Sequence, residues 1–410
     1  MKGPTKPLAL GEFVVLLALM ISIVAMATDI MLPALSVIGR DLEVARANDV
    51  QLVVSSLFAG FALGQLIAGP LSDSYGRKPV IYWGYAVFMA GCLLSVVAAD
   101  LTTMLIGRVL QGLGAAAPRV VLVSMVRDGY AGRAMARIMS IVMSVFILVP
   151  VAAPALGQAI VFAAGWRATF LFLLIQAVVA SLWFAARQPE TLAADNRRPL
   201  SLGAIARGAA EALSNRTVAA YTLAAGFIFG AFLSYLSSAQ QVFQVAFQTG
   251  ELFPLYFAIS ALALGLASFT NSRLVMRFGM RMLTHTALTG LTALSGIFVL
   301  YLLATGDVPP FGLFMTWILA AFFCVGFLFG NLNALAMEPL GHMAGLGAAL
   351  IGSASTFLSL PIGWFVAGRF DGGVLPLVAG FFVSGLMTLI VMRWCERLAP
   401  FGGRSLTEVQ

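Results

Sequence analysis

Long apolar runs separated by short polar connections dominate this chain. Each run is about 20 residues or longer, which is the length that an α-helix needs to cross the hydrocarbon core of a bilayer. Runs of this length with few charges predict membrane-spanning helices. We expect twelve of them, at residues 13–36, 51–71, 79–99, 101–126, 138–162, 167–186, 217–240, 252–272, 282–304, 311–334, 344–367 and 374–394.

A polar stretch at residues 187–216 is the longest break in this pattern. It predicts a six-helix bundle over 1–186, a linker over 187–216 and a second six-helix bundle over 217–410. The segments after the second and eighth runs also resemble each other: in each, a leucine (Leu71, Leu274) is followed five residues later by glycine and then by basic residues. Such an internal sequence repeat is typical of transporters that are built from two parallel repeats.

Composition supports the membrane assignment. The chain is 60% hydrophobic and 10% charged, with a mean hydropathy of +0.97, which excludes an ordinary soluble domain. Cys92, Cys324 and Cys395 lie in apolar runs without paired spacing, so we expect no disulfide, metal or cofactor. The first run resembles a signal peptide, but its apolar pattern continues to Leu35, so we expect an uncleaved span.

The net charge of +7 does not indicate a nucleic-acid partner, because the basic residues sit in the connections between runs. Lys and Arg are enriched in the cytoplasmic connections of membrane proteins. With the N-terminus inside, the outer segments hold only Arg40, Arg46, Arg167 and Arg369. The inner segments then hold Lys2, Lys6, Arg77, Lys78, Arg127, Arg133, Arg137, Arg187, Arg197, Arg198, Arg207, Arg216, Arg273, Arg277, Arg281, Arg393, Arg397 and Arg404. We therefore expect a multi-pass protein of the bacterial inner membrane with both termini in the cytoplasm.

Asp29 is the one carboxylate deep inside an apolar run. A buried charge costs several kcal/mol unless it is paired or neutralised by a proton, so intramembrane carboxylates often mark proton pathways. We expect Asp29 to carry the coupling proton. A purely structural ion pair is the alternative.

Two arginines, Arg108 and Arg119, fall inside the fourth run. At about 1.5 Å per residue, Arg108 lies at nearly the same depth as Asp29, so we expect the two to pair and to couple protons together. Arg119 lies eleven residues on, about three turns nearer the cytoplasm and on nearly the same face. It either binds an anionic or acceptor group of a substrate or extends to the membrane surface.

The connection after the second run reads Gly69-Pro-Leu-Ser-Asp73-Ser-Tyr-Gly76-Arg77-Lys78-Pro79. Over its whole length it resembles the signature loop of the major facilitator superfamily. The resemblance implies that Gly69, Asp73, Gly76, Arg77 and Lys78 form a conformational latch between the two halves on the cytoplasmic side.

Two more segments resemble motifs of the same superfamily. Residues 108–114, with Arg108, Gln111 and Gly112, are similar to the helix-four motif whose arginine is tied to proton coupling. Pro150, Pro154 and Gly157 resemble the antiporter motif of helix five, although Ala153 and Gln158 replace two of its glycines. This departure weakens the inference of export.

Segments in both halves resemble the bicyclomycin/chloramphenicol-resistance (Bcr/CflA) branch of drug:proton antiporters. They are Thr28–Pro33, Gly165–Arg167, Gln188–Leu192, Tyr235–Ser237, Val242–Gln244 and Asn271. A proline that is usual in helix seven of the branch is missing; Gln240 and Gln241 lie in its place, which puts the substrate in doubt.

The resemblance implies an all-α fold of twelve transmembrane helices in two six-helix pseudo-repeats, with a substrate cavity lined by helices one, four, seven and ten. Candidate cavity residues are Asp29, Arg119, Tyr221, Tyr235, Ser238, Gln241, Asn331 and Asn333. Single phenylalanines and methionines are treated as packing residues.

We therefore expect a monomeric, proton-coupled secondary transporter that exports small amphipathic compounds or drugs by alternating access. A dedicated metabolite exporter or an uptake symporter of the same fold stays open. An intramembrane enzyme is disfavoured, because the two histidines, His285 and His342, form no HExxH motif and no GxSxG motif is found. The chain also has no Walker A motif, so direct use of ATP is not expected.

Overall fold

The computed structural model describes residues 8–197 and 199–398, and every regular element in these ranges is helical. Lys2, Lys6, Arg198 and Arg404, which contribute to the expected orientation, lie outside the described residues. The longer helices are α1 (Leu10–Asp29), α2 (Leu35–Asp41), α3 (Leu52–Tyr75), α4 (Arg77–Val96), α5 (Leu101–Gly129), α6 (Gly132–Ala164), α7 (Arg167–Arg187), α8 (Leu202–Ser214), α9 (Arg216–Gln241), α10 (Phe253–Phe278), α11 (Met280–Thr305), α12 (Phe311–Met337), α13 (Ala344–Ala367) and α14 (Leu375–Leu398).

Short helical turns connect or extend these helices. They are η1 (Leu32–Ala34), η2 (Ala47–Gln51), η3 (Ala194–Asn196), η4 (Val242–Ala246), η5 (Gly250–Leu252) and η6 (Glu338–Met343). Within the described ranges, twelve helical segments are long and apolar enough to cross a membrane, which confirms the expected number of spans. The expected polar linker contains a helix, α8, that the apolar pattern did not reveal.

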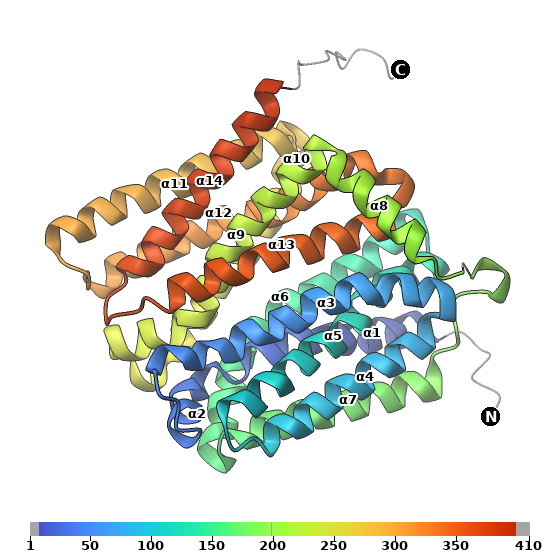
Figure 1. Ribbon diagram of the computed structural model, residues 1–410, viewed down its shortest axis with the longest axis horizontal. Helices are drawn as coiled ribbons and strands as arrows, with labels where there is room; N and C mark the ends of the chain where they lie inside the picture. Colours follow the sequence, from blue (N-terminus) through green and yellow to red (C-terminus); the bar gives the residue numbers. More distant parts are fainter. Residues whose placement is uncertain (1–7, 198, 399–410) are drawn as a thin grey trace.

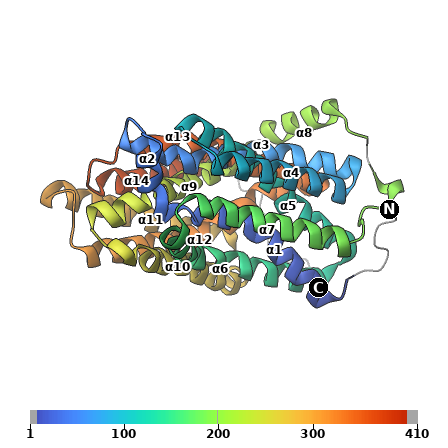
Figure 2. The same cartoon turned by 90° about the horizontal axis from the view of Figure 1, so that it is seen from below.

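The spans form two groups that lie side by side, α1–α7 and α9–α14, and we call them the first half and the second half (Figure 1). Between the halves, α3 packs against α13 and α6 packs against α10. Figure 2 shows the same bundle from below, with α8 at its edge, where it packs against α13 and α9. We call the end of the bundle where α1 begins the terminal face and the end where α2 lies the distal face.

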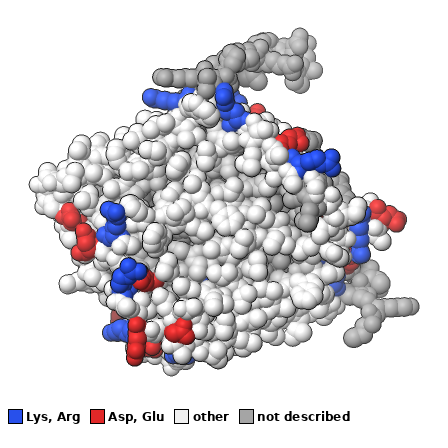
Figure 3. Space-filling view, in the orientation of Figure 1, with Lys and Arg blue, Asp and Glu red and all other residues white. Residues whose placement is uncertain are grey.

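Charged side chains are concentrated toward the two ends of the bundle, and a broad uncharged region separates them (Figure 3). This distribution fits a bilayer around the middle of the helices, since charges are costly in hydrocarbon.

Glycines allow the closest helix contacts within the first half. A Cβ atom on Gly112 of α5 would lie 1.8 Å from the Leu57 carbonyl oxygen of α3, and one on Gly60 of α3 would lie 1.9 Å from the Val109 carbonyl oxygen. Since lipid chains are as apolar as the helices, close backbone packing of this kind replaces the hydrophobic effect as a source of helix association. Gly112 of the 108–114 motif is thus required for the packing of α5 against α3.

Candidate functional site

The first span is interrupted where Asp29 lies. This span runs from Leu10 to Asp41, but α1 ends at Asp29, and the chain passes through η1 before it resumes as α2. Pro33 stands four residues after Asp29 and has no amide hydrogen to donate to the Asp29 carbonyl, so the helix is not continued. The sequence around Pro33 thus places Asp29 at the carboxyl end of a helix inside the span.

α6 packs directly against this interruption. A Cβ atom on Gly157 would lie 1.8 Å from the carbonyl oxygen of Ile30, so only glycine allows this approach. Pro154 and Ala153 of the same helix are buried, and Pro150 is half-buried. The residues that resemble an antiporter motif therefore pack α6 onto the segment next to Asp29.

Arg108 reaches the same region but does not pair with Asp29. Its Nη2 donates to the Ala27 carbonyl at 2.8 Å and its Nε donates to the Val53 carbonyl at 2.9 Å. Its Nη1 donates to Gln111 Oε1 at 2.5 Å. Among the described residues, no carboxylate lies within ion-pair distance of this fully buried guanidinium.

The expected contact between the two side chains is therefore wrong, and the reason lies in the helix end. The last carbonyl groups of an α-helix lack an intrahelical donor. Ala27 belongs to the last turn of α1, and Arg108 supplies the missing donor. The guanidinium is occupied by main-chain carbonyls of α1 and α3, so it contacts the backbone next to Asp29 and not the carboxyl itself.

Asp29 itself has an unsatisfied carboxyl oxygen. The residue is 3% exposed, and its Oδ1 has no hydrogen-bond partner. Tyr235 of α9, in the other half, is 1% exposed; its hydroxyl lies near Ser260 but also lacks a hydrogen bond of normal geometry. α9, which carries Tyr235, packs against η1, which begins three residues after Asp29. Buried polar atoms nearly always have a hydrogen-bond partner. The unpaired oxygens of Asp29 and Tyr235, at the interface of the halves, therefore mark a candidate site.

A row of aromatic rings leads away from this pair along the interface. Tyr235 packs edge-on against Phe322 of α12 with ring centroids 4.6 Å apart, and Phe322 lies 5.8 Å from Phe232. The row continues through Phe329 and Phe229, at centroid distances of 5.4 and 6.1 Å.

The row crosses between the halves at its end, where Phe229 meets Phe58 of α3 at 5.5 Å. Phe229, Phe232 and Phe329 are half-buried, so their faces are not fully covered by protein. Sequence reasoning missed this row because it treated each phenylalanine singly. The available signal was spacing: Phe229 and Phe232 lie three apart and Phe322 and Phe329 seven apart, each pair on one helix face.

Several expected cavity residues make other contacts. Ser238 donates to the Ser234 carbonyl of its own helix at 2.7 Å, and Asn333, which is exposed, donates to the Phe329 carbonyl at 2.9 Å. Asn331 exchanges two amide hydrogen bonds with Asn271 inside the second half. Tyr221 lies within electrostatic reach of Arg281, far along α9 from Tyr235. Of these candidates, Tyr235 is the residue brought close to Asp29.

Gln241 belongs to a polar contact between the halves at the distal face. Its Nε2 donates to Asn48 Oδ1 at 3.0 Å, and its Oε1 accepts from Gln51 Nε2. Asn48 Nδ2 in turn donates to the carbonyls of Gly368 and Phe370, each at 3.0 Å. We call Asn48, Gln51 and Gln241 the distal amide cluster. It ties η2 of the first half to α9 and to the end of α13, so the halves are joined at this face.

Arg119 lies on α5 with its guanidinium 5.5 Å from the ring centre of Phe146 of α6. It is half-buried, and within the described ranges no ion pair or hydrogen bond is found for it. The cation therefore has an aromatic neighbour but no acceptor.

The loop at residues 69–78 is held within the first half. Arg77 donates to Asp73 at 2.5 Å and to Asp128 of α5 at 2.9 Å. Gly76 has a φ of 104°, a conformation that favours glycine. The backbone amides of the next two residues, Arg77 and Lys78, both donate to the Glu190 carboxylate. This capping by Glu190 fixes the amino end of α4.

These contacts all lie within the first half and the start of the linker, so the expected latch between the halves stays a prediction. Lys78 Nζ adds a bond of 2.5 Å to the Gln188 carbonyl, so the segment after α7 is the loop's main partner. Gly69 lies in α3, seven residues before Gly76, and a Cβ atom there would meet only Val120, at 3.9 Å. The loop thus connects α3, α4 and α5 to the start of the linker in this conformation.

Comparison with known proteins identifies the family. The model of the Major Facilitator Superfamily matches residues 17–364. The bicyclomycin resistance protein homolog of Haemophilus influenzae is 31% identical over 364 residues, which cover 87% of this chain and 88% of that protein. Multidrug resistance protein D of Escherichia coli is 27% identical over 351 residues, or 83% of this chain and 84% of that protein. The expected resemblance to the bicyclomycin-resistance branch is confirmed.

Solved structures confirm the fold. The xylose transporter XylE of E. coli, in a partially occluded inward open conformation, superposes with a TM-score of 0.72 at 12% identity, covering 97% of this chain and 99% of that chain. The human organic anion transporter MFSD10 gives a TM-score of 0.66 at 16% identity, covering 95% of this chain and 100% of that chain. With its twelve spans in two halves and a family match over most of its length, this chain belongs to the Major Facilitator Superfamily and is a membrane transporter.

Proposed function

We propose that this transporter exports small amphipathic compounds with aromatic groups in exchange for protons, by alternating access. The observation that carries the proposal is the buried, unpaired carboxyl oxygen of Asp29 at the interface of the halves, next to the aromatic row. Relatives described as bicyclomycin-resistance and multidrug-resistance proteins support a drug-like substrate.

In the proposed cycle, a proton or a cationic substrate satisfies the Asp29 carboxyl, and the two exclude each other. Phe229, Phe232 and Phe329 supply partly uncovered ring faces for the apolar part of the substrate. Arg108 holds the backbone of α1 in place, so the carboxyl presents the same geometry to both occupants. Arg119 offers a guanidinium without an acceptor to the polar group of a substrate.

Asp29→Asn tests the coupling. The amide keeps the size of the side chain but carries neither a negative charge nor an exchangeable proton. We therefore expect pH-driven transport to fall to background, and the binding of a cation to weaken and to lose its dependence on pH. The measurement is transport of a lipophilic aromatic cation in proteoliposomes under an imposed pH gradient. Asp195→Asn, an exposed carboxylate of the linker, is the matched control and should transport like the unaltered protein. Full pH-driven transport by Asp29→Asn would move the proton site elsewhere.

Phe229→Ala tests the aromatic row. Removing this ring breaks the contact with Phe58 across the interface and should raise the KM for an aromatic cation about two- to tenfold, the range expected for an aromatic pair worth about 0.5–1.5 kcal/mol. Phe162→Ala is the control, because Phe162 is 90% exposed and does not belong to the aromatic row. An equal effect of both substitutions would argue that the row is only packing.

The described conformation is proposed to be closed at the distal face and to belong to the inward-facing side of the cycle. The distal amide cluster joins the halves there, and the structural neighbour XylE has a partially occluded inward open conformation. In the opposite conformation these bonds have to break. Neutral amide bonds suit this purpose, since each contributes about 0.5–1.5 kcal/mol net.

Asn48→Ala removes three hydrogen bonds, which together contribute more than about 1.4 kcal/mol to the closed distal face. The population should therefore shift by about tenfold toward the conformation that is open at that face. Spin-label distances across that face report the shift. Asn333→Ala serves as control, because its amide bonds only to its own helix. Unchanged distances in Asn48→Ala would show that the cluster does not hold this face closed.

The terminal face is proposed to be cytoplasmic, on the strength of the basic residues in its connections. An enzyme that works only in the cytoplasm should then be active when it is inserted in the exposed linker at Asp195. An enzyme that works only in the periplasm should be active when it is inserted at Asp307, on the other side of the membrane. The reverse pattern would invert the proposed direction of transport.

A further inference from the structure

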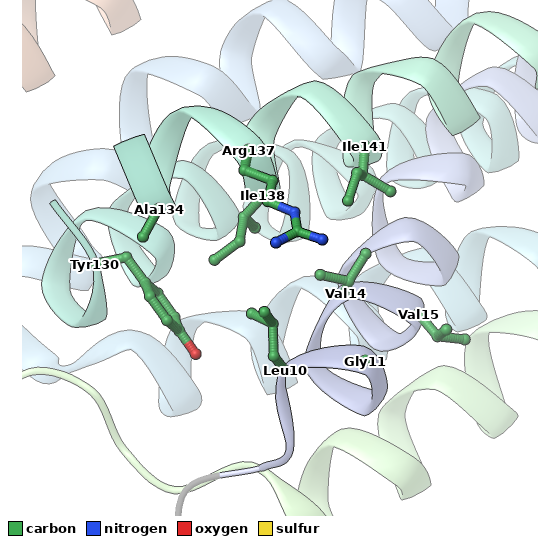
Figure 4. A pocket seen from close by; sticks show the side chains of 9 residues that line it. All are labelled: Leu10, Gly11, Val14, Val15, Tyr130, Ala134, Arg137, Ile138 and Ile141. Carbon is green, nitrogen blue, oxygen red and sulfur yellow. The ribbon is translucent and has the colours of Figure 1, made fainter. Parts of the chain in front are cut away.

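A groove runs between α1 and α6 near the terminal face (Figure 4). Its volume is about 530 Å³. Leu10, Gly11, Val14 and Val15 of α1 form one side; Ala134, Arg137, Ile138 and Ile141 of α6 form the other, and Tyr130 closes one end.

The groove opens on the outer surface of the bundle. Leu10, Val15 and Ile141 are 45%, 55% and 42% exposed, values that an aliphatic side chain in a span reaches where it meets lipid. Gly11 adds to the hollow, because an atom built at its Cβ position would meet nothing within 4 Å. The space is therefore open to the surroundings of the protein along an apolar lining.

Arg137 is the one charged residue in this lining. It lies five residues after the start of α6, about 8 Å along the helix, a depth near the headgroup level of a bilayer. In Figure 4 its guanidinium hangs over Val14 inside the groove. It is exposed, and in the part of the chain that the structure describes it makes no ion pair or hydrogen bond.

We propose that this groove binds an anionic phospholipid, with the phosphate on the Arg137 guanidinium and an acyl chain along the apolar lining. The charge complementarity is specific: one uncompensated cation stands at the headgroup level above an otherwise apolar hollow, and basic pockets between spans bind anionic headgroups in this way. A zwitterionic lipid fits less well, because its own cation competes with Arg137 for the phosphate. A free phosphate lacks the chain that the apolar lining accommodates.

The position of the groove gives the lipid a structural role. α1 and α6 also meet at Ile30 and Gly157, next to Asp29, and the groove separates the same two helices at the terminal face. A bound lipid would fill this gap and join the two helices near the terminal face. It should therefore stabilise the folded protein, since a ligand that binds only the native state raises its stability.

The test uses the full-length protein, purified in detergent and stripped of lipid. Phosphatidylglycerol and phosphatidylcholine with identical acyl chains are added in parallel, and glycerol phosphate provides the headgroup without chains. Melting temperature and native mass spectrometry are read together. We expect phosphatidylglycerol to bind and to raise the melting temperature by a few degrees, phosphatidylcholine to do so less, and glycerol phosphate not at all.

Three variants locate the effect. Arg137→Gln should weaken phosphatidylglycerol binding about fivefold, the attraction that one basic residue contributes toward an anionic lipid, and should remove the preference over phosphatidylcholine. Arg127→Gln removes an exposed cation nearby that does not line the groove, and it should keep the preference. Gly11→Leu fills the hollow and should reduce binding of both lipids.

The proposal is overturned if the unaltered protein binds both lipids equally, or if Arg137→Gln keeps the full preference for phosphatidylglycerol. It is also overturned if glycerol phosphate alone reproduces the shift, which would identify a simple anion site. These outcomes are independent of transport, so they do not bear on the proposed export.

Discussion

Inside a bilayer every backbone polar group needs a partner within the protein, and this constraint is sharpest where α1 breaks at Asp29. Pro33 removes the donor that would have continued the helix. The carbonyl end that results is satisfied from outside the helix, by the Arg108 guanidinium at Ala27. The closeness of α6 at Gly157 covers the same segment. The position of the Asp29 carboxyl depends on all three residues.

This dependence changes how Arg108 is understood. A guanidinium that is fully buried and bonded to carbonyls of two different helices joins α1, α3 and α5 around one point. Removing it would leave the buried Ala27 carbonyl at the end of α1 without a donor, which is costly in a low-dielectric interior. Its importance therefore does not require a direct contact with the carboxyl whose surroundings it fixes.

The interface between the halves differs in chemistry along its length. Neutral amides close the distal face, aromatic rings fill the middle, and the strongest ionic contacts, such as Arg77 with Asp128, stay within one half. In the proposed cycle, bonds that break in every turnover need to be weak, whereas bonds that keep each half rigid need to be strong. Neutral amides and ring contacts meet the first need, and charge-assisted hydrogen bonds meet the second.

Hydrophobic periodicity and short glycine-rich motifs are local properties, so they predict the twelve spans, the two halves and the family without any knowledge of contacts. The sequence also singled out Asp29, since one carboxylate in an apolar run is visible without any contact. Depth along a helix was equally accessible: Arg108 does reach α1 within two residues of Asp29. What depth does not give is direction around the helix axis, and this is why the expected ion pair was wrong.

Only the tertiary structure decided which polar groups are left without a partner. Gln241, Asn331 and Ser238 look equivalent as polar residues in apolar runs, yet the structure gives each an acceptor or a donor and leaves Asp29 and Tyr235 unsatisfied. The aromatic row and the groove at Arg137 likewise arise from helices that are distant in sequence. Pairing is a property of the assembled bundle, because a hydrogen bond depends on the position of two groups and the sequence specifies the position of neither.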